Sequence, residues 1–270
     1  MLSLWTDYLT AGLAQDHFVR ELTKGEDGPF FQRIWEMMLG RHLLVCGYEV
    51  TSPHQDRHPD FRCVMNGLVL WVEATCITSG QDAALAPDAD WLCSSGYVPH
   101  DKILLRWTNA LNSKIKQAKA QRAAGIIDTG DAYVIAINGG LIAAGNYGFG
   151  ASRRPFVVEA TLAVGELQFS YDRKTLAFKG AEHRVRTHLL KENKSPVPTT
   201  AFYDMKNAGI SAVVGCGTLR VEASTLPLLV AHNPHADSPL APNRLGPETQ
   251  EWSAVLTGKD AEATYWEIRE

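Results

Sequence analysis

The stretch HPDFRCVMNGLVLWVEAT, residues 58–75, decides the fold of this chain. Asn66-Gly67 stands between two apolar runs, and this dipeptide is the strongest short-range signal for a two-residue type I′ turn. Counting outward from the turn gives the cross-strand pairs Met65–Leu68, Val64–Val69, Arg62–Trp71 and Asp60–Glu73. The sequence therefore predicts a β-hairpin in which two carboxylates face each other.

The two faces of this hairpin differ in character. Side chains alternate along a strand, so Thr75 shares a face with Asp60 and Glu73. The opposite face is apolar and comprises Phe61, Cys63, Met65, Leu68, Leu70, Val72 and Ala74. A shift by one residue would bury the acids, so this face fixes the register. Directly opposed like charges, with Cβ atoms about 5 Å apart, are destabilising, and a divalent cation is the simplest group that would neutralise them.

The whole chain has the composition of a globular protein. It has 270 residues, of which 45% are hydrophobic and 21% charged, and its formal net charge is -4. That charge argues against a protein that coats nucleic acid non-specifically, although it allows a local basic cleft. The cysteines lack CxxC spacing, and no secretion signal or long apolar run is visible. We therefore expect a cytoplasmic protein with reduced thiols and no membrane contact.

Hydrophobic periodicity predicts the remaining elements. Helices are predicted at residues 1–23, 30–45 and 101–124, and strands at 48–51, 60–65, 68–75 and 132–137. From residue 30 onward this order predicts an α/β fold, with a central mixed sheet flanked by helices over residues 1–138. Residues 139–270 are predicted to form a C-terminal α+β extension that packs on this core as part of the same domain. Strands near 210–215 and 226–231 are expected to extend the sheet.

A third carboxylate completes the expected site. Glu36 lies in the middle of an apolar helix, where an unpaired charge is costly, and its position makes sense if it faces a metal ion or a water bound to one. Asp60, Glu73 and Glu36 are thus candidate ligands for Mg²⁺, or for Mn²⁺ in its place, because hard cations prefer carboxylate oxygens. Such an ion would polarise a phosphoryl group and activate a water for its hydrolysis.

This arrangement resembles the PD-(D/E)xK nuclease superfamily. The residues that carry the resemblance are Glu36, Pro59-Asp60 and Glu73-Ala74-Thr75, within the first half of the chain. The resemblance implies a restriction-endonuclease-like α-β-β-β-α-β core and Mg²⁺-dependent cleavage of DNA or RNA, with DNA favoured. It also implies Asp60 and Glu73 as metal ligands, with Glu36 as a further ligand or a residue that supports them.

One position departs from that pattern, because Thr75 stands where the superfamily has lysine. A hydroxyl orients a water but supplies no positive charge to the developing phosphorane. Lys114 is the candidate replacement, since it follows Leu111 by three residues on the apolar stripe of helix 101–124 that faces the sheet. A lysine snorkelling at the edge of that stripe is the alternative. Gln117 is its neighbour on the helix surface, suited to hold a water or a phosphate oxygen.

Basic side chains near this site are candidate contacts to nucleic acid, the expected partner. Arg62 is the best placed, because it shares a face with Asp60. The other candidates are Arg57, Lys102 and Arg106. Residues 78–99 are rich in small and polar side chains without periodicity, and they are a candidate lid over a cleft. A homodimer is compatible with the sequence.

Several alternatives stay open. A nuclease-like fold that lost turnover with its lysine would be a binding module for nucleic acid or protein, and the same metal site would also suit a small phosphoester. His54 and His58 have the spacing of a zinc site, but prolines bracket them in a loop, so a polar loop is favoured. Val-Glu-Ala-Thr recurs at 158–161 without an opposed aspartate, and Glu159 is accordingly expected on the surface.

Overall fold

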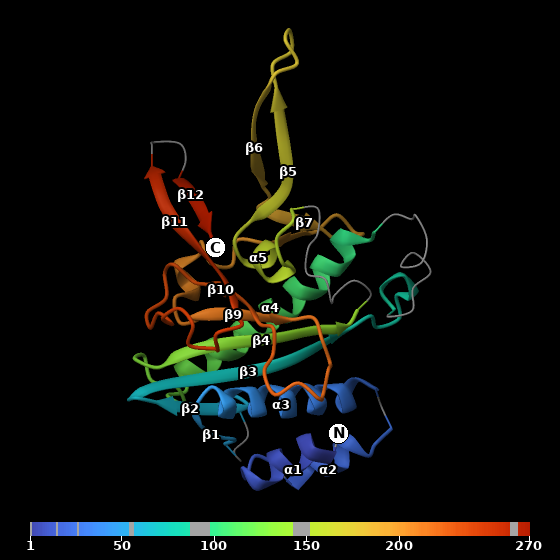
Figure 1. The fold of residues 1–270 in the computed structure, drawn as a ribbon, viewed down its shortest axis with the longest axis vertical. Coiled ribbons are helices and arrows are strands. Elements are labelled where there is room, and N and C mark those ends of the chain that lie inside the picture. Colours follow the sequence, from blue (N-terminus) through green and yellow to red (C-terminus); the bar gives the residue numbers. More distant parts are fainter. Residues whose placement is uncertain are drawn as a thin grey trace.

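The computed structural model describes residues 2–14, 16–25, 27–53, 57–86, 98–142, 152–259 and 264–270. The helices are α1 (Leu2–Thr10), α2 (Asp16–Leu22), α3 (Asp27–Val45), α4 (His100–Ala123) and α5 (Phe156–Thr161). The main strands are β1 (Glu49–Thr51), β2 (Phe61–Met65), β3 (Leu68–Thr78), β4 (Ala132–Leu141), β9 (Ala212–Cys216), β10 (Leu229–His232), β11 (Gln250–Lys259) and β12 (Thr264–Arg269). They form one eight-stranded mixed sheet in the order β1-β2-β3-β4-β9-β10-β11-β12 (Figure 1). The protein is therefore an α/β protein.

In the described residues, four further strands lie outside this sheet. β5 (Val164–Tyr171) pairs with β6 (Phe178–Val185), and β7 (His188–Leu190) pairs with β8 (Pro196–Pro198). Short 3₁₀ turns cover Ala83–Leu85 and Met205–Asn207. In the described part of the chain, no helix combines the length and apolar character that crossing a bilayer requires.

The hairpin of β2 and β3 has the predicted register. Met65 pairs with Leu68, and Arg62 pairs with Trp71. Asn66 and Gly67 have φ angles of 51° and 79°, the positive values that a type I′ turn requires at both central positions. The turn prediction is thus confirmed. On its other edge β3 runs parallel to β4.

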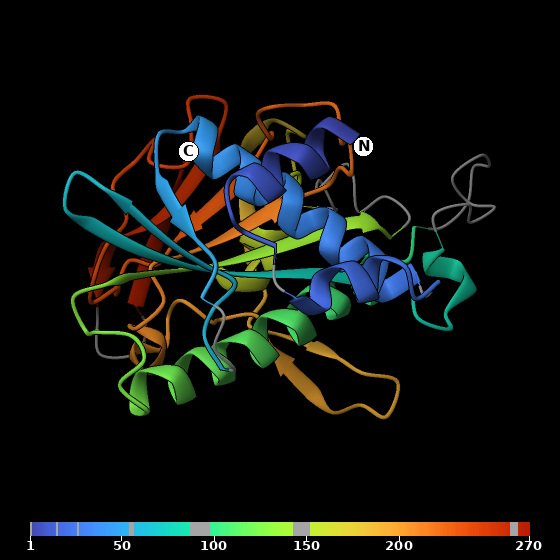
Figure 2. The same ribbon diagram turned by 90° about the horizontal axis from the view of Figure 1, so that it is seen from below.

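Two layers of side chains cover the sheet, one on each face. Phe61 and Leu70 belong to the core under α1 and α3, whereas Trp71 and Tyr133 belong to the core under α4 and α5. Figure 2 shows α3 and α4 on opposite faces of the sheet. Full burial of a large apolar side chain contributes about 1.5–3 kcal/mol, so these two cores hold the register of the hairpin.

The N-terminal helix differs from its prediction. Residues 1–23 were expected to form one helix, but α1 ends at Thr10 and α2 starts at Asp16. Gly12 has a φ of +68° and donates its N–H to the carbonyl of Leu9, and Leu13 donates to Tyr8. This is the hydrogen-bond pattern of a helix C-cap with glycine in the left-handed region, and it turns the chain after α1.

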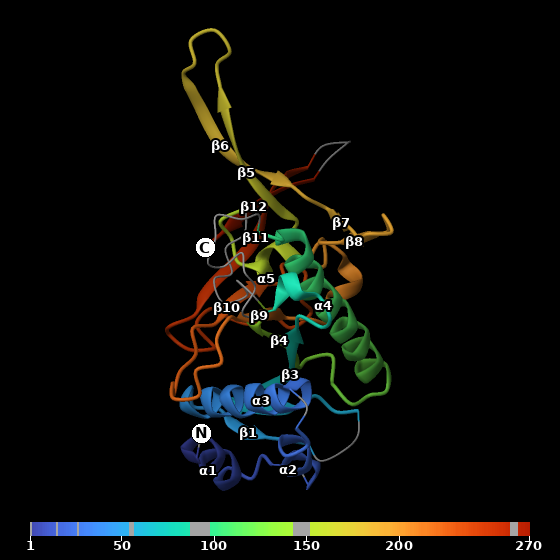
Figure 3. The same cartoon turned by 90° about the vertical axis from the view of Figure 1, so that its right-hand side faces the viewer.

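The C-terminal half completes the main sheet. β9 runs parallel to β4, and β10 runs antiparallel to β9, which confirms the strands predicted near 210–215 and 226–231. β11 and β12 were not predicted, although they add two more strands beyond β10. The boundary predicted at residue 138 falls inside β4, so both halves share one sheet. The ribbon of β5 and β6 projects away from the rest (Figure 3).

Candidate functional site

The candidate site is built where β2 and β3 separate. β2 begins at Phe61, opposite Val72, whereas β3 continues well beyond that pair. Asp60 precedes β2 and lies outside the ladder, and its Oδ2 accepts a hydrogen bond from the backbone N–H of Ala74 at 2.7 Å. The ladder thus ends before the predicted pair of Asp60 and Glu73, and the Asp60 side chain binds the β3 backbone one residue further on.

Glu73 and Lys114 form an ion pair that joins β3 to α4. Nζ of Lys114 lies 2.6 Å from Oε1 of Glu73 and also donates to Oε1 of Gln117 at 3.2 Å. The Glu73 side chain is only 4% exposed. Burial and the nearby charge of Asp60 raise the pKa of Glu73 to about 7, while Lys114 and Gln117 act in the opposite direction. The structure thus brings these four side chains together.

Glu36 lies on α3, on the opposite face of the sheet from α4, and it is buried. Its Oε1 accepts a hydrogen bond from Gln32 at 2.8 Å, and its Oε2 accepts one from Arg33 at 2.5 Å. Burial and the charge of Asp60 raise the pKa of Glu36 well above its ordinary value, and Arg33 opposes this. Each carboxylate oxygen of Glu36 thus accepts a hydrogen bond from its own helix, which holds the side chain in place.

Gln32 is a site residue that the sequence analysis missed. Its Nε2 also donates to the carbonyl of Ala74 at 3.2 Å, and its Oε1 accepts from the N–H of Cys76 at 2.7 Å. β2 no longer pairs with this part of β3, so one glutamine side chain takes over backbone groups that a strand would otherwise bind. The available signal was its position four residues before Glu36, on the same face of the helix.

Thr75 and Arg62 lie on the same side of the hairpin as Glu73. Thr75 is half-buried on β3 and pairs with Ile137 of β4. Arg62 lies opposite Trp71, with its guanidinium carbon 5.9 Å from the ring centroid. This is the geometry of a cation–π contact, which holds the arginine against the hairpin. Arg62 is therefore placed between the turn and the acids.

Lys102 and Arg106, predicted as substrate contacts, lie further along α4 from the acids and bind groups of the protein itself. Arg106 donates to the carbonyl of Ser79 at 2.8 Å, and Lys102 pairs with Asp82 at 3.0 Å. At 1.5 Å per residue, they lie about 12 and 18 Å along α4 from Lys114. Both side chains hold the segment that follows β3.

The loop before β2 is described only in part. His54, Gln55 and Asp56 lie outside the described residues, and so does one half of the alternative zinc site of His54 with His58, for which a polar loop was favoured. The ring of His58 lies 6.2 Å from that of Trp71, and the carbonyl of Arg57 accepts a hydrogen bond from Gln121 at 2.9 Å. Most of the candidate lid, residues 87–97, also lies outside the described residues.

Two carboxylates, those of Asp60 and Glu73, would be the ligands of a divalent cation at this site. Within the described residues, no group of three or more His, Cys, Asp or Glu side chains is arranged to hold a metal ion. However, Oε2 of Glu73 is buried and accepts no hydrogen bond from them, and a buried oxygen normally has a partner. Mg²⁺ is commonly held by one or two carboxylates and keeps several waters. Asp60 and Glu73 fit such an ion.

Glu159 is fully buried, so the prediction that it lies on the surface is wrong. Its Oε2 lies 2.6 Å from Arg186 and 2.9 Å from His100, and its Oε1 accepts a hydrogen bond from Ser152. Burial alone would lower the pKa of His100, but the carboxylates of Asp101 and Glu159 raise it to about 9. These partners lie far apart in the sequence, which is why the spacing around Glu159 gave no sign of them.

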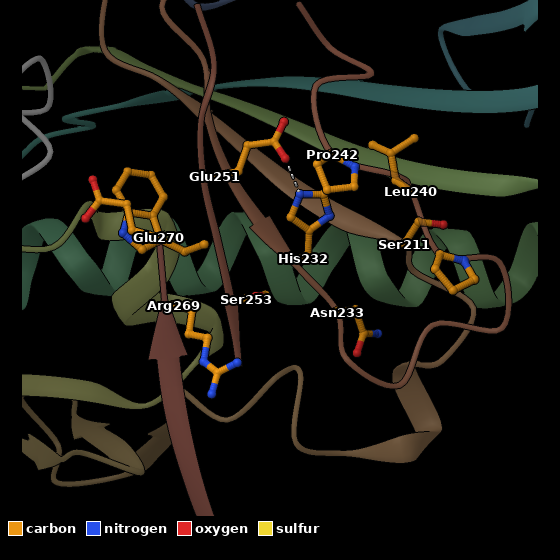
Figure 4. Close-up of a pocket in the computed structure, with 11 residues that line it drawn as sticks. Ser211, His232, Asn233, Leu240, Pro242, Glu251, Ser253, Arg269 and Glu270 are labelled. Atoms are coloured by element: carbon orange, nitrogen blue, oxygen red, sulfur yellow. Dashed lines mark hydrogen bonds and ion pairs between the residues drawn. The ribbon is translucent and has the colours of Figure 1, made fainter. Parts of the chain in front are cut away.

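A cavity of about 400 Å³ lies beside β10 and β11, toward the opposite edge of the sheet from β2 (Figure 4). Its lining includes His232 and Glu251, which pair at 2.9 Å. Glu251 also accepts hydrogen bonds from the N–H of Asn243 and the hydroxyl of Thr249. The other charged lining residues, Arg269 and Glu270, also have ion-pair partners. The His232–Glu251 pair thus links β10 to β11, and Glu251 also holds the loop at Asn243 to the sheet.

No protein-family model, curated protein or solved structure matches this chain. A fold does not by itself determine a function, which depends on the chemistry and geometry of the site residues.

Proposed function

We propose that this protein is a metal-dependent nuclease that hydrolyses phosphodiester bonds of nucleic acid. The observation that carries the proposal is the 2.6 Å pair of Lys114 and Glu73, beside Asp60, at the point where two strands separate. Two acids can hold the metal ion that assists phosphodiester hydrolysis, and a lysine beside them can stabilise negative charge on the phosphoryl group. The order α3-β1-β2-β3-α4-β4, with Glu36 on α3, supports a restriction-endonuclease-like core.

Each side chain of the site has its own role in the proposed reaction. Asp60 and Glu73 would hold Mg²⁺ or Mn²⁺, which when bound polarises the phosphoryl group and lowers the pKa of a water. Lys114 keeps a positive charge beside Glu73, where it can stabilise negative charge that develops on the phosphoryl oxygens. Gln117 accepts a hydrogen bond from Lys114 and orients its ammonium group. Thr75, two residues after Glu73 on the same face of β3, is placed to orient the attacking water.

In this proposal the substrate is nucleic acid, and DNA is favoured over RNA. Arg62 is the basic side chain on the hairpin face that carries Glu73, and we expect it to contact a backbone phosphate. Phosphate contacts position a nucleic acid without reading its sequence, so this site by itself confers no base preference.

A cleavage assay tests the proposal. Single- and double-stranded DNA and RNA are incubated with the protein in Mg²⁺, in Mn²⁺ and in chelator, and products are resolved on denaturing gels. We expect products that depend on the metal and disappear in Glu73→Gln and Asp60→Asn. Glu222→Gln, at an exposed acid outside the site, is the matched control and should cleave like the wild type. Wild-type cleavage by the Asp60→Asn/Glu73→Gln double variant would refute this site.

A second candidate function is a binding module without turnover. It is favoured by the ion pairs of Glu73 with Lys114 and of Glu36 with Arg33, which neutralise both acids without a metal ion. Binding of nucleic acid without products in any metal supports this alternative. Calorimetry with Mn²⁺ separates the two, because only the nuclease needs a metal site that Glu73→Gln weakens.

A further inference from the structure

The ribbon of β5 and β6, residues 164–185, forms an arm that extends beyond the body of the protein (Figures 1 and 3). Its two strands pair only with each other. The register joins Leu167 to His183, Phe169 to Ala181 and Tyr171 to Phe178. Because directly opposed residues share a face, the large apolar side chains of both strands gather on one side of the arm.

Three aromatic side chains form the exposed centre of that face. Phe169, Tyr171 and Phe178 are 52%, 57% and 59% exposed. The ring of Phe178 lies 6.4 Å from that of Phe169 and 5.7 Å from that of Tyr171. The rings therefore pack against one another, while about half of each side chain stays exposed. A monomer rarely leaves a contiguous group of large apolar side chains in water, so such a face marks an interaction surface.

The charge of the arm is opposite in sign to that of the chain. Within the arm, residues 164–185, the basic residues are Arg173, Lys174, Lys179 and Arg184, and the acidic residues are Glu166, Asp172 and Glu182. The chain as a whole has a net charge of -4. Lys179 pairs with Asp172 at 3.0 Å, which leaves Arg173 and Lys174 as exposed cations in the turn that follows Tyr171. Arg184 neighbours His183 on β6 and therefore lies on the opposite side of the arm from the aromatic face.

The base of the arm is fixed to the body. Arg186 follows β6 and donates its N–H to the carbonyl of Ala163 at 2.7 Å. Its guanidinium group pairs with the buried Glu159 at 2.6 Å and with Asp101 of α4 at 3.1 Å. A buried carboxylate therefore anchors the base of the arm.

We propose that this arm binds single-stranded nucleic acid, with bases stacked on Phe169, Tyr171 and Phe178 and phosphates held by Arg173 and Lys174. Aromatic side chains beside cations are the usual platform for unpaired bases. A second copy of the chain fits less well, because a symmetric contact between two arms would oppose two surfaces of net positive charge. This inference rests on the proposed function and adds to it the part of the substrate that lies outside the cleavage site.

Fluorescence anisotropy with labelled oligothymidylate in chelator tests the arm separately from the chemistry. We expect Phe169→Ala/Phe178→Ala to weaken binding about tenfold or more, and Arg173→Glu/Lys174→Glu to weaken it and to flatten its salt dependence. Leu9→Ala, at an exposed apolar residue of α1, is the matched control and should bind like the wild type. Circular dichroism checks that each variant is folded, which is expected because the changed side chains are exposed.

The outcomes separate the two proposals. Metal-dependent cleavage with unchanged affinity in both arm variants would overturn the role of the arm and leave the nuclease standing. Binding that both arm variants weaken, without cleavage in any metal, would overturn the nuclease and leave the arm standing. Sedimentation that shows a dimer, which the aromatic variant converts to monomers without loss of nucleic-acid affinity, would assign the face to a second copy and overturn the proposal.

Discussion

Lys114 on α4 lies 2.6 Å from Glu73 on β3, although 41 residues separate the two in the sequence. This pair links the helix to the centre of the sheet and puts a cation beside the carboxylate with a raised pKa. The proposed chemistry depends on this ion pair, and so do the expected pH dependence of cleavage and the expected effect of Lys114→Met.

Cleavage in Mg²⁺ should increase as the pH rises through about 7. Burial and Asp60 raise the pKa of Glu73 to about 7, and a carboxylate must lose its proton before it can hold a cation. A higher Mg²⁺ concentration should move the midpoint of this increase to lower pH, because the cation competes with the proton. Initial rates across the pH range at several Mg²⁺ concentrations measure the midpoint. A midpoint that ignores Mg²⁺ would mean that Glu73 does not hold the ion.

Lys114→Met should lower kcat by about 10²–10³-fold, the usual effect of losing one group that stabilises developing charge. It should also lower the free energy of unfolding, because Glu73 is then buried without its cation. Lys116→Met is the matched control, since Lys116 is exposed on the same helix. Stopped-time cleavage assays and urea titrations provide the two measurements. Equal kcat for both variants would remove Lys114 from the mechanism.

Gln32→Leu should lower the free energy of unfolding by about 1–3 kcal/mol, because the N–H of Cys76 and the carbonyl of Ala74 lose their partner. The loss should be local, so hydrogen exchange at the Cys76 amide should become faster than exchange in β4. Gln81→Leu, at an exposed glutamine, provides the comparison. If the Cys76 amide kept its protection in Gln32→Leu, the assigned contact would be wrong.

Acid should weaken the protein through His42. Its Nδ1 accepts from the N–H of Leu226, and its Nε2 lies 2.7 Å from the carbonyl of Leu245, so the folded state holds the neutral ring. Burial lowers the pKa of His42 below its ordinary 6.5. The stability present above that pH is therefore lost as the pH falls below it, by at most about 1.4 kcal/mol per pH unit.

Urea titrations of His42→Leu measure this effect. The variant should be less stable than the wild type at neutral pH, but it should lack the part of the acid slope that His42 contributes. His188→Leu, at an exposed histidine, should keep the wild-type slope. Identical slopes in the wild type and His42→Leu would show that another group titrates.

Local signals in the sequence predicted the local structure. Asn66-Gly67 set the register of β2 and β3 because a two-residue turn leaves no freedom in the pairing that follows. The apolar stripes that predicted α3 and α4 were also correct within a few residues. Lys114 was expected to face the sheet, and its stripe places it beside Glu73.

Features that depend on distant partners were missed. β11 belongs to the sheet because it pairs with the edge of β10, and β12 pairs in turn with β11. Nothing within residues 250–269 reveals the edge of β10. Glu159 is buried because Arg186 and His100 neutralise it from other elements. Arg106 was expected to contact the substrate, and its hydrogen bond to the carbonyl of Ser79 was not predicted. The charge and the spacing of residues in the sequence do not show which distant partner a side chain will bind.

The contacts of Gln32 also determine what else can reach β3. An unpaired stretch of strand exposes alternating donors and acceptors, which recruit foreign extended peptides and start aggregation. Here a primary amide mimics the peptide group of a neighbour and closes the gap at Ala74 and Cys76. Asp60 and Glu73 can therefore lie where β2 and β3 separate without exposing an unpaired strand edge to which another peptide could add.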